Sequence, residues 1–377
     1  MTTAEKKTDI YKGLVGVTVD ETKVSKVMPE INSLTYRGYP VQDLAEKYPF
    51  EDVAYLLWYG ELPSPEEAKI FRDFERANRQ VSPKIYNAIL NYPKSSHPMD
   101  TTRTSVSLLA LEDPLTNDNS IESNQEKAVK LMAKLPTMVA ADFRARKGLK
   151  PIPPQADLSF SENFFYMCFG EKADKEFVKA FDVTMTLYAE HGFNASTFTA
   201  RVIASSLSDM HASVVGAISS LKGPLHGGAN EAVMNMFLEI GRPENAKEWM
   251  LKKFRQKEKI MGFGHRVYRK GDSRVPTMKK YYEILAKKTH RIDLLTMSNS
   301  IEDIMVREKN IYPNLDYPAG PAYYLMGFDV HFFTPFFVMS RITGWTAHIM
   351  EQLENNRLIR PLAEYTGVAQ RKLPSLK

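Results

Sequence analysis

The chain has 377 residues, of which 43% are hydrophobic and 25% charged, and its formal net charge is +5. This composition is typical of a globular protein with a large core and more than one domain. The positive charge is dispersed along the chain, so we expect no nucleic-acid partner. Apolar runs such as residues 330–340 fall well short of the ~20 residues of a membrane span, and residues 1–9 are polar. We therefore expect neither a membrane segment nor a secretory signal.

Cys168 is the only cysteine, and it stands in the apolar run of residues 165–169. No internal disulfide is possible, which suits a reducing compartment and a cytoplasmic protein. We expect Cys168 to be a buried core thiol rather than a reactive group.

Strand signals are confined to the N-terminal part. Val15, Val17 and Val19 alternate with other residues, which predicts one short strand. No repeated alternation of strands and helices follows, so the predicted fold class is all-α.

Helix signals begin in the next part of the chain. Val53, Leu56 and Leu57 lie on one helical face that ends at Gly60. Residues 64–67 read Ser-Pro-Glu-Glu, which supplies a capping hydroxyl, a proline at the first helical position and two acids at the positive end of a helix. A second helix is therefore predicted to begin there.

Two later segments are predicted to form buried helices. Residues 194–221 are rich in small side chains, which allow helix backbones to approach closely, so we expect central helices there and a possible subunit contact. A long helix is predicted from apolar residues spaced four, three, four and four apart: Val338, Ile342, Trp345, Ile349 and Leu353.

Glycine and proline clusters interrupt the C-terminal half of the chain. They fall at residues 223–224, 262–264, 271 and 318–321. We interpret them as hinges of an inserted unit. The segment between the first and last cluster is therefore predicted to be a second domain inserted into the first.

Three histidines, His191, His226 and His265, stand in loop or helix-entry contexts. Glycines flank the last two, which permits tight turns and close approach of a ligand to the backbone. Together with Asp316 they could bind zinc or iron. However, no histidines are paired at helical ligand spacing, so we expect no metal. The glycine-rich loop 262–264 lacks the dinucleotide and P-loop patterns and by itself indicates only a tight turn.

Arginines form a second pattern near these histidines. Arg269 and Arg274 follow His265, while Arg341 and Arg360 lie on or after the long C-terminal helix. Several arginines favour a ligand with two or three carboxylates, because each guanidinium can donate two parallel hydrogen bonds to a carboxylate. The alternative is an ordinary solvated helix face.

Three motifs bring these residues together. They are GPLHGGANE at residues 223–231, MGFGHRVY at 261–268 and PNLD at 313–316, and they resemble, in order and spacing, the catalytic motifs of citrate synthases. The resemblance runs from residues 34–39 through 97–100 to 359–361, covering nearly the whole chain. Residues 187–201, 271–278 and 344–352 resemble the 2-methylcitrate synthase branch in particular.

The resemblance implies a role for each candidate residue. Asp316 would be the general base that removes a proton beside the thioester carbonyl. His226 would donate to the thioester oxygen; its position before a predicted helix start favours the neutral imidazole. His265 would donate to the keto oxygen of oxaloacetate. The carboxylates of oxaloacetate would be bound by His191, Arg274, Arg341 and Arg360.

The resemblance also implies the partners of the chain. It indicates a large helical domain of residues 1–222 and 320–377, with a small helical domain of residues 223–319 inserted into it, and a cleft that closes between the two domains. It also indicates a homodimer in which Arg360 reaches the site of the partner subunit. Acyl-CoA would be a co-substrate, and no tightly bound cofactor is expected. The coenzyme A site would comprise Lys259, Ile260, Met261, Gly262, Phe263, Gly264 and Arg269.

The identity of the acyl group and the presence of catalysis leave alternatives open. The resemblance favours propionyl-CoA, with acetyl-CoA also accepted; the alternative is strict use of acetyl-CoA. Tyr317 and Pro318, directly after the predicted base, are candidates for lining the acyl space, or they merely shape the loop. A catalytically silent helical scaffold is the alternative from a different class of protein.

Overall fold

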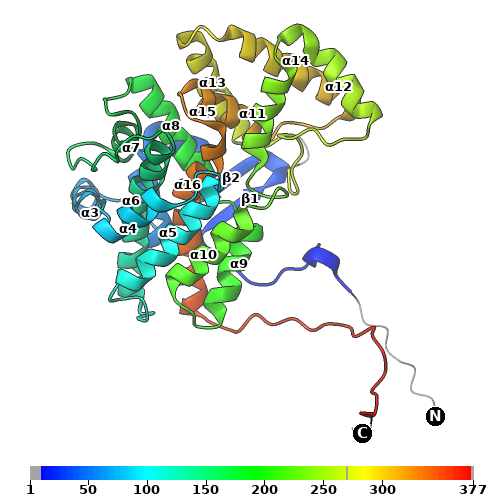
Figure 1. Ribbon diagram of the computed structural model, residues 1–377. Coiled ribbons are helices and arrows are strands. Elements are labelled where there is room, and N and C mark those ends of the chain that lie inside the picture. The colour runs from blue at the N-terminus through cyan, green and yellow to red at the C-terminus, as the bar shows by residue number, and fades with distance from the viewer. Residues whose placement is uncertain (1–9, 269–270, 375–377) are drawn as a thin grey trace.

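The computed structural model describes residues 10–268 and 271–374, and these form a predominantly helical protein (Figure 1). The described residues contain sixteen α-helices: α1 (Val41–Lys47), α2 (Phe50–Tyr59), α3 (Pro65–Ala77), α4 (Pro83–Asn91), α5 (Pro98–Glu112), α6 (Ile121–Arg146), α7 (Phe160–Phe169), α8 (Lys175–Tyr188), α9 (Ala195–Ser205), α10 (Met210–Leu221), α11 (Ala229–Ile240), α12 (Ala246–Arg255), α13 (Val275–Lys288), α14 (Ile292–Lys309), α15 (Asp316–Leu325) and α16 (Phe333–Glu354). Short 3₁₀ helices are η1 (Lys12–Leu14), η2 (Pro29–Ile31), η3 (Pro243–Asn245) and η4 (Val330–Phe332). The all-α prediction is confirmed.

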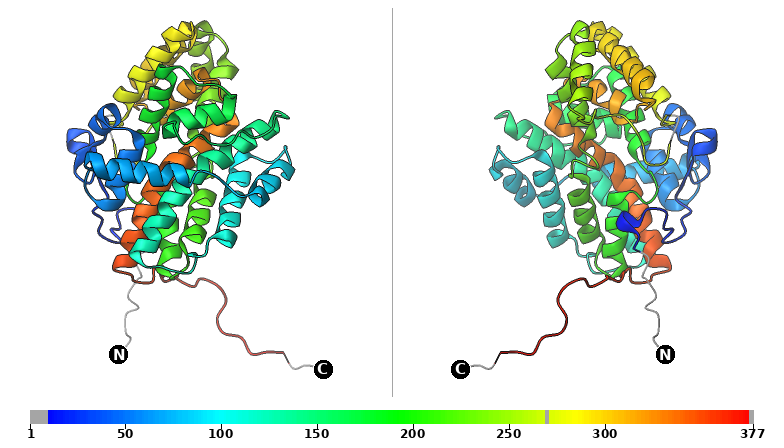
Figure 2. Two further views of the ribbon diagram at one scale, coloured as in Figure 1. Left: turned by 90° about the vertical axis from the view of Figure 1, so that its left-hand side faces the viewer. Right: turned by 90° about the vertical axis from the view of Figure 1, so that its right-hand side faces the viewer.

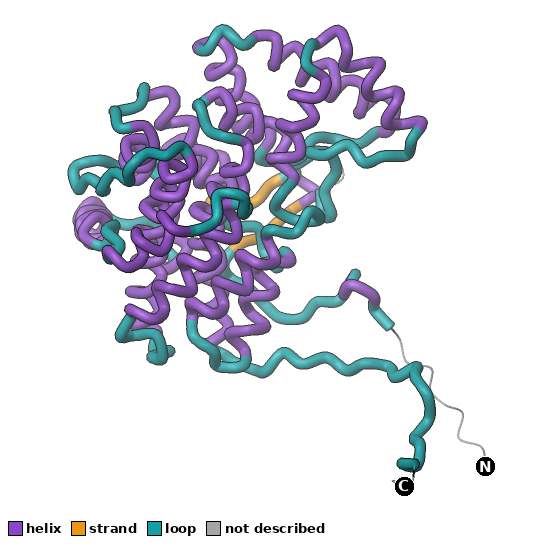
Figure 3. Tube along the Cα trace, in the orientation of Figure 1, coloured by secondary structure: helices purple, strands orange, loops and turns teal. Residues whose placement is uncertain are grey.

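One small sheet accompanies the helices, and it lies outside the segment predicted to form a strand. The antiparallel strands β1 (Ser25–Met28), β2 (Ser33–Tyr36) and β3 (Tyr39–Pro40) follow one another in order (Figure 3). The prediction of a strand at Val15–Val19 is wrong, because these residues have no strand conformation and both end valines are exposed. Alternation alone makes no strand without a neighbour to complete its hydrogen bonds, and β1 obtains that neighbour from the turn into β2.

The predicted helix boundaries at α2 and α3 are confirmed. Gly60 ends α2 with φ of +93°, a conformation that glycine adopts without steric cost. The Ser64 hydroxyl accepts the backbone N–H of Glu67, whose carboxylate accepts the N–H of Ser64 in return. This reciprocal cap satisfies two of the donors that a helix start leaves open.

Helix α16 runs through the centre of the molecule, as its apolar spacing predicts. Nearly all of its residues from Phe333 to Met350 are buried, and it packs against α6, α8, α9 and α10 (Figure 2). Helices α9 and α10 pack closely together. A Cβ atom at Gly216 would lie 2.1 Å from the Ile203 side chain, which explains the small residues in this pair.

Helices α11 to α14 occupy one end of the molecule, and the C-terminal segment leaves the other (Figure 1). In that upper region α12 packs against α14, while α11 and α13 both pack against α15. Asn356 and Ile359 are still hydrogen-bonded to Ser205, and residues 360–374 then run away from the helical body (Figures 1 and 2). Within the described residues, no helix combines the length and apolar character needed to cross a membrane.

Candidate active site

The loops that carry two of the predicted residues are joined to each other. Two backbone hydrogen bonds of 2.8 and 2.9 Å and one antiparallel bridge connect loop 262–264 to loop 312–314. The Asn314 side-chain amide donates a further bond of 3.0 Å to the first loop. His265 directly follows the first loop, and Asp316 follows the second. Their relative placement is therefore set by the backbone.

Gly262 is required for this arrangement. Its φ is +83°, and a Cβ atom there would lie 2.5 Å from the Val233 side chain and 3.0 Å from that of Tyr317. A larger residue would push loop 262–264 away from α11 and α15.

Asp316 is the first residue of α15, and two neighbours orient it. The Tyr188 hydroxyl donates to Asp316 Oδ1 at 2.6 Å, while Asn314 Oδ1 accepts the Asp316 N–H at 3.1 Å. Burial raises the pKa of Asp316 to about 6, although the Tyr188 bond and the charges of Arg274 and Arg341 act in the opposite direction. Near neutral pH the group is an ionised carboxylate of increased basicity, as general-base catalysis requires.

His226 lies in a tight turn just before α11. Its Nε2 lies 3.2 Å from the backbone N–H of Ser196 and 2.8 Å from that residue's hydroxyl. A backbone N–H can only donate, so Nε2 is the acceptor, and in the neutral ring the proton belongs on Nδ1. Burial, aided by the charge of Arg341, lowers the pKa of His226 to about 4. The ring is thus a neutral donor.

His265 is neutral too, with the opposite tautomer. Its Nδ1 accepts the backbone N–H groups of Val267 and Tyr268 at 3.0 and 3.1 Å. Nε2 therefore carries the proton. Burial and the charge of Arg274 lower the pKa of His265 to about 4.

His191 lies beside His265, with 4.9 Å between the ring centroids. Burial is the main cause that lowers the pKa of His191 well below its usual value. Its Nε2 is buried and has no hydrogen-bond partner among the described residues. A buried polar atom without a partner is costly, so this nitrogen is suited to a polar ligand.

Arg274 enters the same region already paired. Its Nε and Nη2 donate to the two oxygens of Asp272 at 2.9 and 2.7 Å, and Nη1 lies 3.3 Å from Leu187 O. Asp272 also accepts the N–H of Leu315, which connects the pair to the Asp316 loop. The Nε–Nη2 edge of the Arg274 guanidinium is therefore already paired with Asp272.

Arg341 is buried in the middle of α16. Its Nε donates to Tyr188 O at 2.6 Å, and its guanidinium lies over the Phe337 ring at 4.7 Å. Burial lowers its pKa to about 10, so the group stays charged at neutral pH. Its Nη1 and Nη2 atoms make no hydrogen bond to any described residue, which leaves the outer fork available for a carboxylate.

Behind these groups lies a buried charged cluster. Glu190 accepts from the Ser25 hydroxyl and lies 2.9 Å from His348 Nε2. Arg201 donates to Glu351, which lies 3.5 Å from His348. The cluster connects the segment that bears His191 to α16 and to the strand β1.

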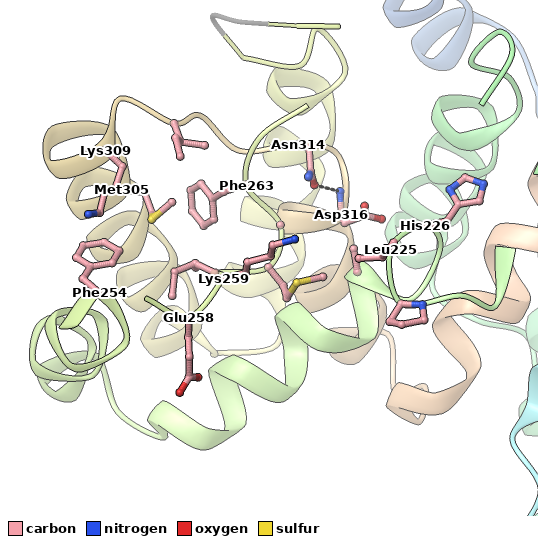
Figure 4. A pocket seen from close by; sticks show the side chains of 16 residues that line it. Leu225, His226, Phe254, Glu258, Lys259, Phe263, Met305, Lys309, Asn314 and Asp316 are labelled. Atoms are coloured by element: carbon pink, nitrogen blue, oxygen red, sulfur yellow. Dashed lines mark hydrogen bonds between the residues drawn. The ribbon is translucent and has the colours of Figure 1, made fainter. Parts of the chain in front are cut away.

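A cavity of about 500 Å³ opens beside Asp316 and His226 (Figure 4). Of the residues predicted to contact coenzyme A, five line it: Lys259, Ile260, Met261, Gly262 and Phe263. Phe254 and Lys309 lie at the end far from Asp316 (Figure 4). Gly264 is not part of the lining, and Arg269 lies outside the described residues.

Three further residues that the sequence indicated are not part of the lining of this cavity. Arg360 is exposed on the segment that leaves the helical body. Tyr317 and Pro318 are absent from the cavity lining, which favours the alternative that they shape the loop, while a role in bordering the acyl space stays a prediction. The Tyr317 hydroxyl donates to Ser298 O at 2.7 Å and its ring packs on Phe263, so it shapes the loop.

Sequence reasoning missed the supporting residues. Tyr188, Asp272, Ser196 and Asn314 each contact a predicted residue directly. Two of them had a local signal, since Asn314 precedes Asp316 by two residues and Asp272 precedes Arg274 by two. Tyr188 and Ser196 had none, because their partners are more than twenty residues away.

Taken together, the helical fold brings a buried carboxylate, neutral imidazoles and arginines suited to a polycarboxylate into one region, which is typical of an enzyme active site. Comparison with known proteins agrees with this class. Residues 13–362 match the family model described as "Citrate synthase, C-terminal domain". The chain belongs to the citrate synthase family.

Individual relatives match over nearly their full length. The chain is 55% identical over 372 residues to a 2-methylcitrate synthase of Mycobacterium tuberculosis, covering 99% of this chain and 94% of the relative. It is also 55% identical to a citrate synthase of Mycolicibacterium smegmatis, covering 97% of each. A solved citrate synthase from Thermoplasma acidophilum, in ternary complex with carboxymethyl coenzyme A and oxaloacetate, matches with a TM-score of 0.92 and 32% identity, covering 97% of this chain and 98% of that one.

Proposed function

We propose that the cleft joins the α-carbon of a short acyl-CoA to the keto carbon of oxaloacetate, with Asp316 as the base that starts the reaction. The observation that carries this proposal is the pairing of Asp316 and His226 on one cavity. Asp316 takes the α-proton, and His226 donates its Nδ1–H to the thioester oxygen where negative charge develops. A neutral donor is available there throughout the range in which Asp316 is ionised.

The second half of the reaction uses the residues around His191. His265 donates its Nε2–H to the keto oxygen, which makes the keto carbon more electrophilic. The enol carbon attacks that carbon and forms the new carbon–carbon bond. Water then hydrolyses the thioester, releasing coenzyme A and a tricarboxylate. Arg341, Arg274 and His191 hold the carboxylates of oxaloacetate, a role supported by the unpartnered His191 Nε2 and the free outer fork of Arg341.

The coenzyme occupies the cavity as a co-substrate, with no tightly bound cofactor. The cavity is supported as its site by its position beside the proposed base and by residues 259–263 along its wall. Lys259 supplies a positive charge for the phosphates. Gly264 serves the loop geometry, and Arg269 is kept as a further candidate contact for the coenzyme.

The chain acts as a homodimer in the cytoplasm, with Arg360 completing the oxaloacetate site of the partner. Two features support the dimer: Arg360 is exposed on the segment that leaves the helical body, and this segment exposes large apolar side chains such as Leu362 and Tyr365. The single cysteine supports a reducing compartment. Residues 223–319 move as a small domain against residues 1–222 and 320–377, closing over oxaloacetate.

Propionyl-CoA is the preferred acyl donor, and acetyl-CoA is used as well. The similarity to 2-methylcitrate synthases supports this preference, while the similarity to citrate synthases supports the second activity. A pocket with space for the additional methylene still admits the smaller group.

A thiol-release assay tests the function. Purified protein is mixed with oxaloacetate and either propionyl-CoA or acetyl-CoA, and free coenzyme A is measured with a thiol reagent. We expect release that depends on oxaloacetate and is accompanied by 2-methylcitrate or citrate. Release of coenzyme A without either tricarboxylate would indicate a thioesterase. The absence of release with both donors would favour the catalytically silent scaffold.

A further inference from the structure

A group of potential metal ligands lies outside the cleft, where three separate elements meet. His97 caps the start of α5, Glu231 is in the first turn of α11, and His331 belongs to η4. Their ligand atoms all lie within 4.8 Å of one another. Glu231 Oε2 is 3.1 Å from His97 Nε2 and 3.8 Å from His331 Nδ1. Among the described residues this is the only such group of three.

The carboxylate of Glu231 is already oriented. Its Oε1 accepts the backbone N–H of Thr334 at 3.2 Å and the hydroxyl of the same residue. Its Oε2 is thereby left on the side of the two imidazoles. Outer hydrogen bonds of this kind fix the direction of a metal-binding carboxylate before the ion arrives.

We propose that His97, Glu231 and His331 bind a divalent transition ion of the zinc class. Two imidazole nitrogens and one carboxylate oxygen are the donor set that Zn²⁺ takes when a fourth position stays open to water. Ligands about 2.0–2.2 Å from one tetrahedral ion lie roughly 3.4 Å apart. The two distances from Glu231 bracket this separation. His331 makes the remaining adjustment, because its side chain is 69% exposed and its ring is free to turn.

Binding requires one rearrangement, at His97. Its Nδ1 accepts the backbone N–H of Met99 at 3.2 Å, so in the free protein Nε2 carries the proton and donates to Glu231. The ion takes the lone pair of Nε2, so the proton moves to Nδ1 and the bond from Met99 is lost. Coordination outweighs this single capping bond.

The site would connect three elements that the chain does not join directly. Helix α11 follows the turn that bears His226, while α5 and η4 come from other parts of the chain. An ion held by all three would therefore stabilise the folded protein and hold the start of α11 in place. The proposal concerns binding alone, and its test is independent of the proposed reaction.

The test compares Zn²⁺ binding by the purified protein, His331→Ala and His290→Ala. Zn²⁺ is titrated against a chromophoric chelator that competes for it, and thermal unfolding is followed with and without Zn²⁺. His290 is the matched control, because it is an exposed histidine outside the group. Neither exchange removes a residue from the cleft.

We expect the wild type and His290→Ala to bind one equivalent with micromolar or better affinity and to unfold at a higher temperature with Zn²⁺. His331→Ala should bind at least about tenfold more weakly, since even an outer-shell partner is worth about 10–100-fold in affinity. It should unfold like the wild type without Zn²⁺. Equal affinity in all three proteins, or no binding by the wild type, would overturn the proposal.

Discussion

Arg341 and Arg360 are proposed to bind the same substrate, yet they lie in contrasting surroundings. Arg341 is buried at the centre of α16, with one bond to a backbone carbonyl and a phenyl ring beneath it. Arg360 is exposed on a segment whose nearest anchor is the bond from Ile359 N–H to the Ser205 hydroxyl. Arg341 therefore has partners in its own chain before a ligand binds, whereas Arg360 has none among the described residues.

The contrast indicates which part of the proposed oxaloacetate site a single chain can form by itself. Desolvating a guanidinium is costly, and the fold offsets that cost at Arg341 and Arg274 with partners from the same chain. Arg360 has no such partners in the described part of its chain. Leu362 and Leu373, on the same C-terminal segment, are 91% and 94% exposed. An exposed apolar segment of this kind is suited to a surface on another subunit.

The largest effect is expected at the proposed base. Asp316→Asn keeps the shape of the side chain but removes the proton acceptor, so turnover should fall about 10²–10⁴-fold. Oxaloacetate should still bind, because its arginines are unchanged. Asp303→Asn is the matched control, since Asp303 is exposed on α14 and should leave turnover near that of the wild type. An Asp316→Asn enzyme with near-normal turnover would refute the assignment.

Arg274→Leu and Arg360→Leu test the difference between an arginine that has partners in its own chain and one that has none there. Each should raise the KM for oxaloacetate far more than that for acyl-CoA, since losing one partner of a desolvated charge pair costs about 2–5 kcal/mol. Only Arg274→Leu should also destabilise the fold, by about 3–5 kcal/mol, because it leaves Asp272 buried and unpaired. Steady-state kinetics and chemical denaturation separate the two effects. Equal destabilisation by both exchanges would remove the distinction.

The pH dependence should report on Asp316. Its raised pKa of about 6 means that the base is protonated, and inactive, below that pH, so kcat/KM for the acyl-CoA should fall about tenfold per pH unit there. The histidines of the cleft stay neutral in this range, because burial lowers the pKa values of His226 and His265 to about 4 and the pKa of His191 well below its usual value. A profile that is flat between pH 5 and pH 7, measured with stable protein, would argue against this base.

Tyr188→Phe should shift that profile. The Tyr188 hydroxyl bonds to the ionised form of Asp316 and so lowers its pKa. Removing the bond should move the acidic limb to higher pH by up to about one unit, which corresponds to about 1.4 kcal/mol. Turnover well above the limb should change little. Tyr324→Phe is the control, because no hydrogen bond connects that residue to Asp316 in the described structure. An unmoved limb in Tyr188→Phe would show that the bond has no electrostatic role.

The remaining prediction concerns the acyl group. Propionyl-CoA should be preferred over acetyl-CoA. The ratio of their specificity constants should not exceed about 200, because one methylene in an apolar pocket contributes only about 1–3 kcal/mol, or about 10–200-fold. Specificity constants for both thioesters at one saturating oxaloacetate concentration provide the measurement. A preference for acetyl-CoA above about tenfold would assign the chain to citrate formation.

The features that the sequence predicted are those determined within a few residues. The cap at Ser64, the end of α2 at Gly60 and the apolar spacing of α16 depend on local geometry, and all three are confirmed. The strand predicted at Val15 failed because a strand depends on a partner elsewhere in the chain.

Sequence motifs likewise indicated the loops of the cleft but not their supports. The partners of Asp316 and His226, Tyr188 and Ser196, are brought in by tertiary packing, which short-range patterns do not encode. Adjacency to Asp316 in sequence likewise does not by itself turn the Tyr317 side chain toward the same cavity, because successive helical residues face different directions.

Subunit mixing tests the central claim, that one chain's Asp316 works with the Arg360 of another. Arg360→Leu and Asp316→Asn proteins, each of low activity, are mixed and allowed to exchange subunits, and exchange is confirmed with differently tagged chains. Half of the randomly formed dimers are hybrids, and each hybrid has one site with both residues intact, so activity should rise to about a quarter of the wild-type value. Activity that stays at the average of the two separate variants, despite confirmed exchange, would contradict the shared site.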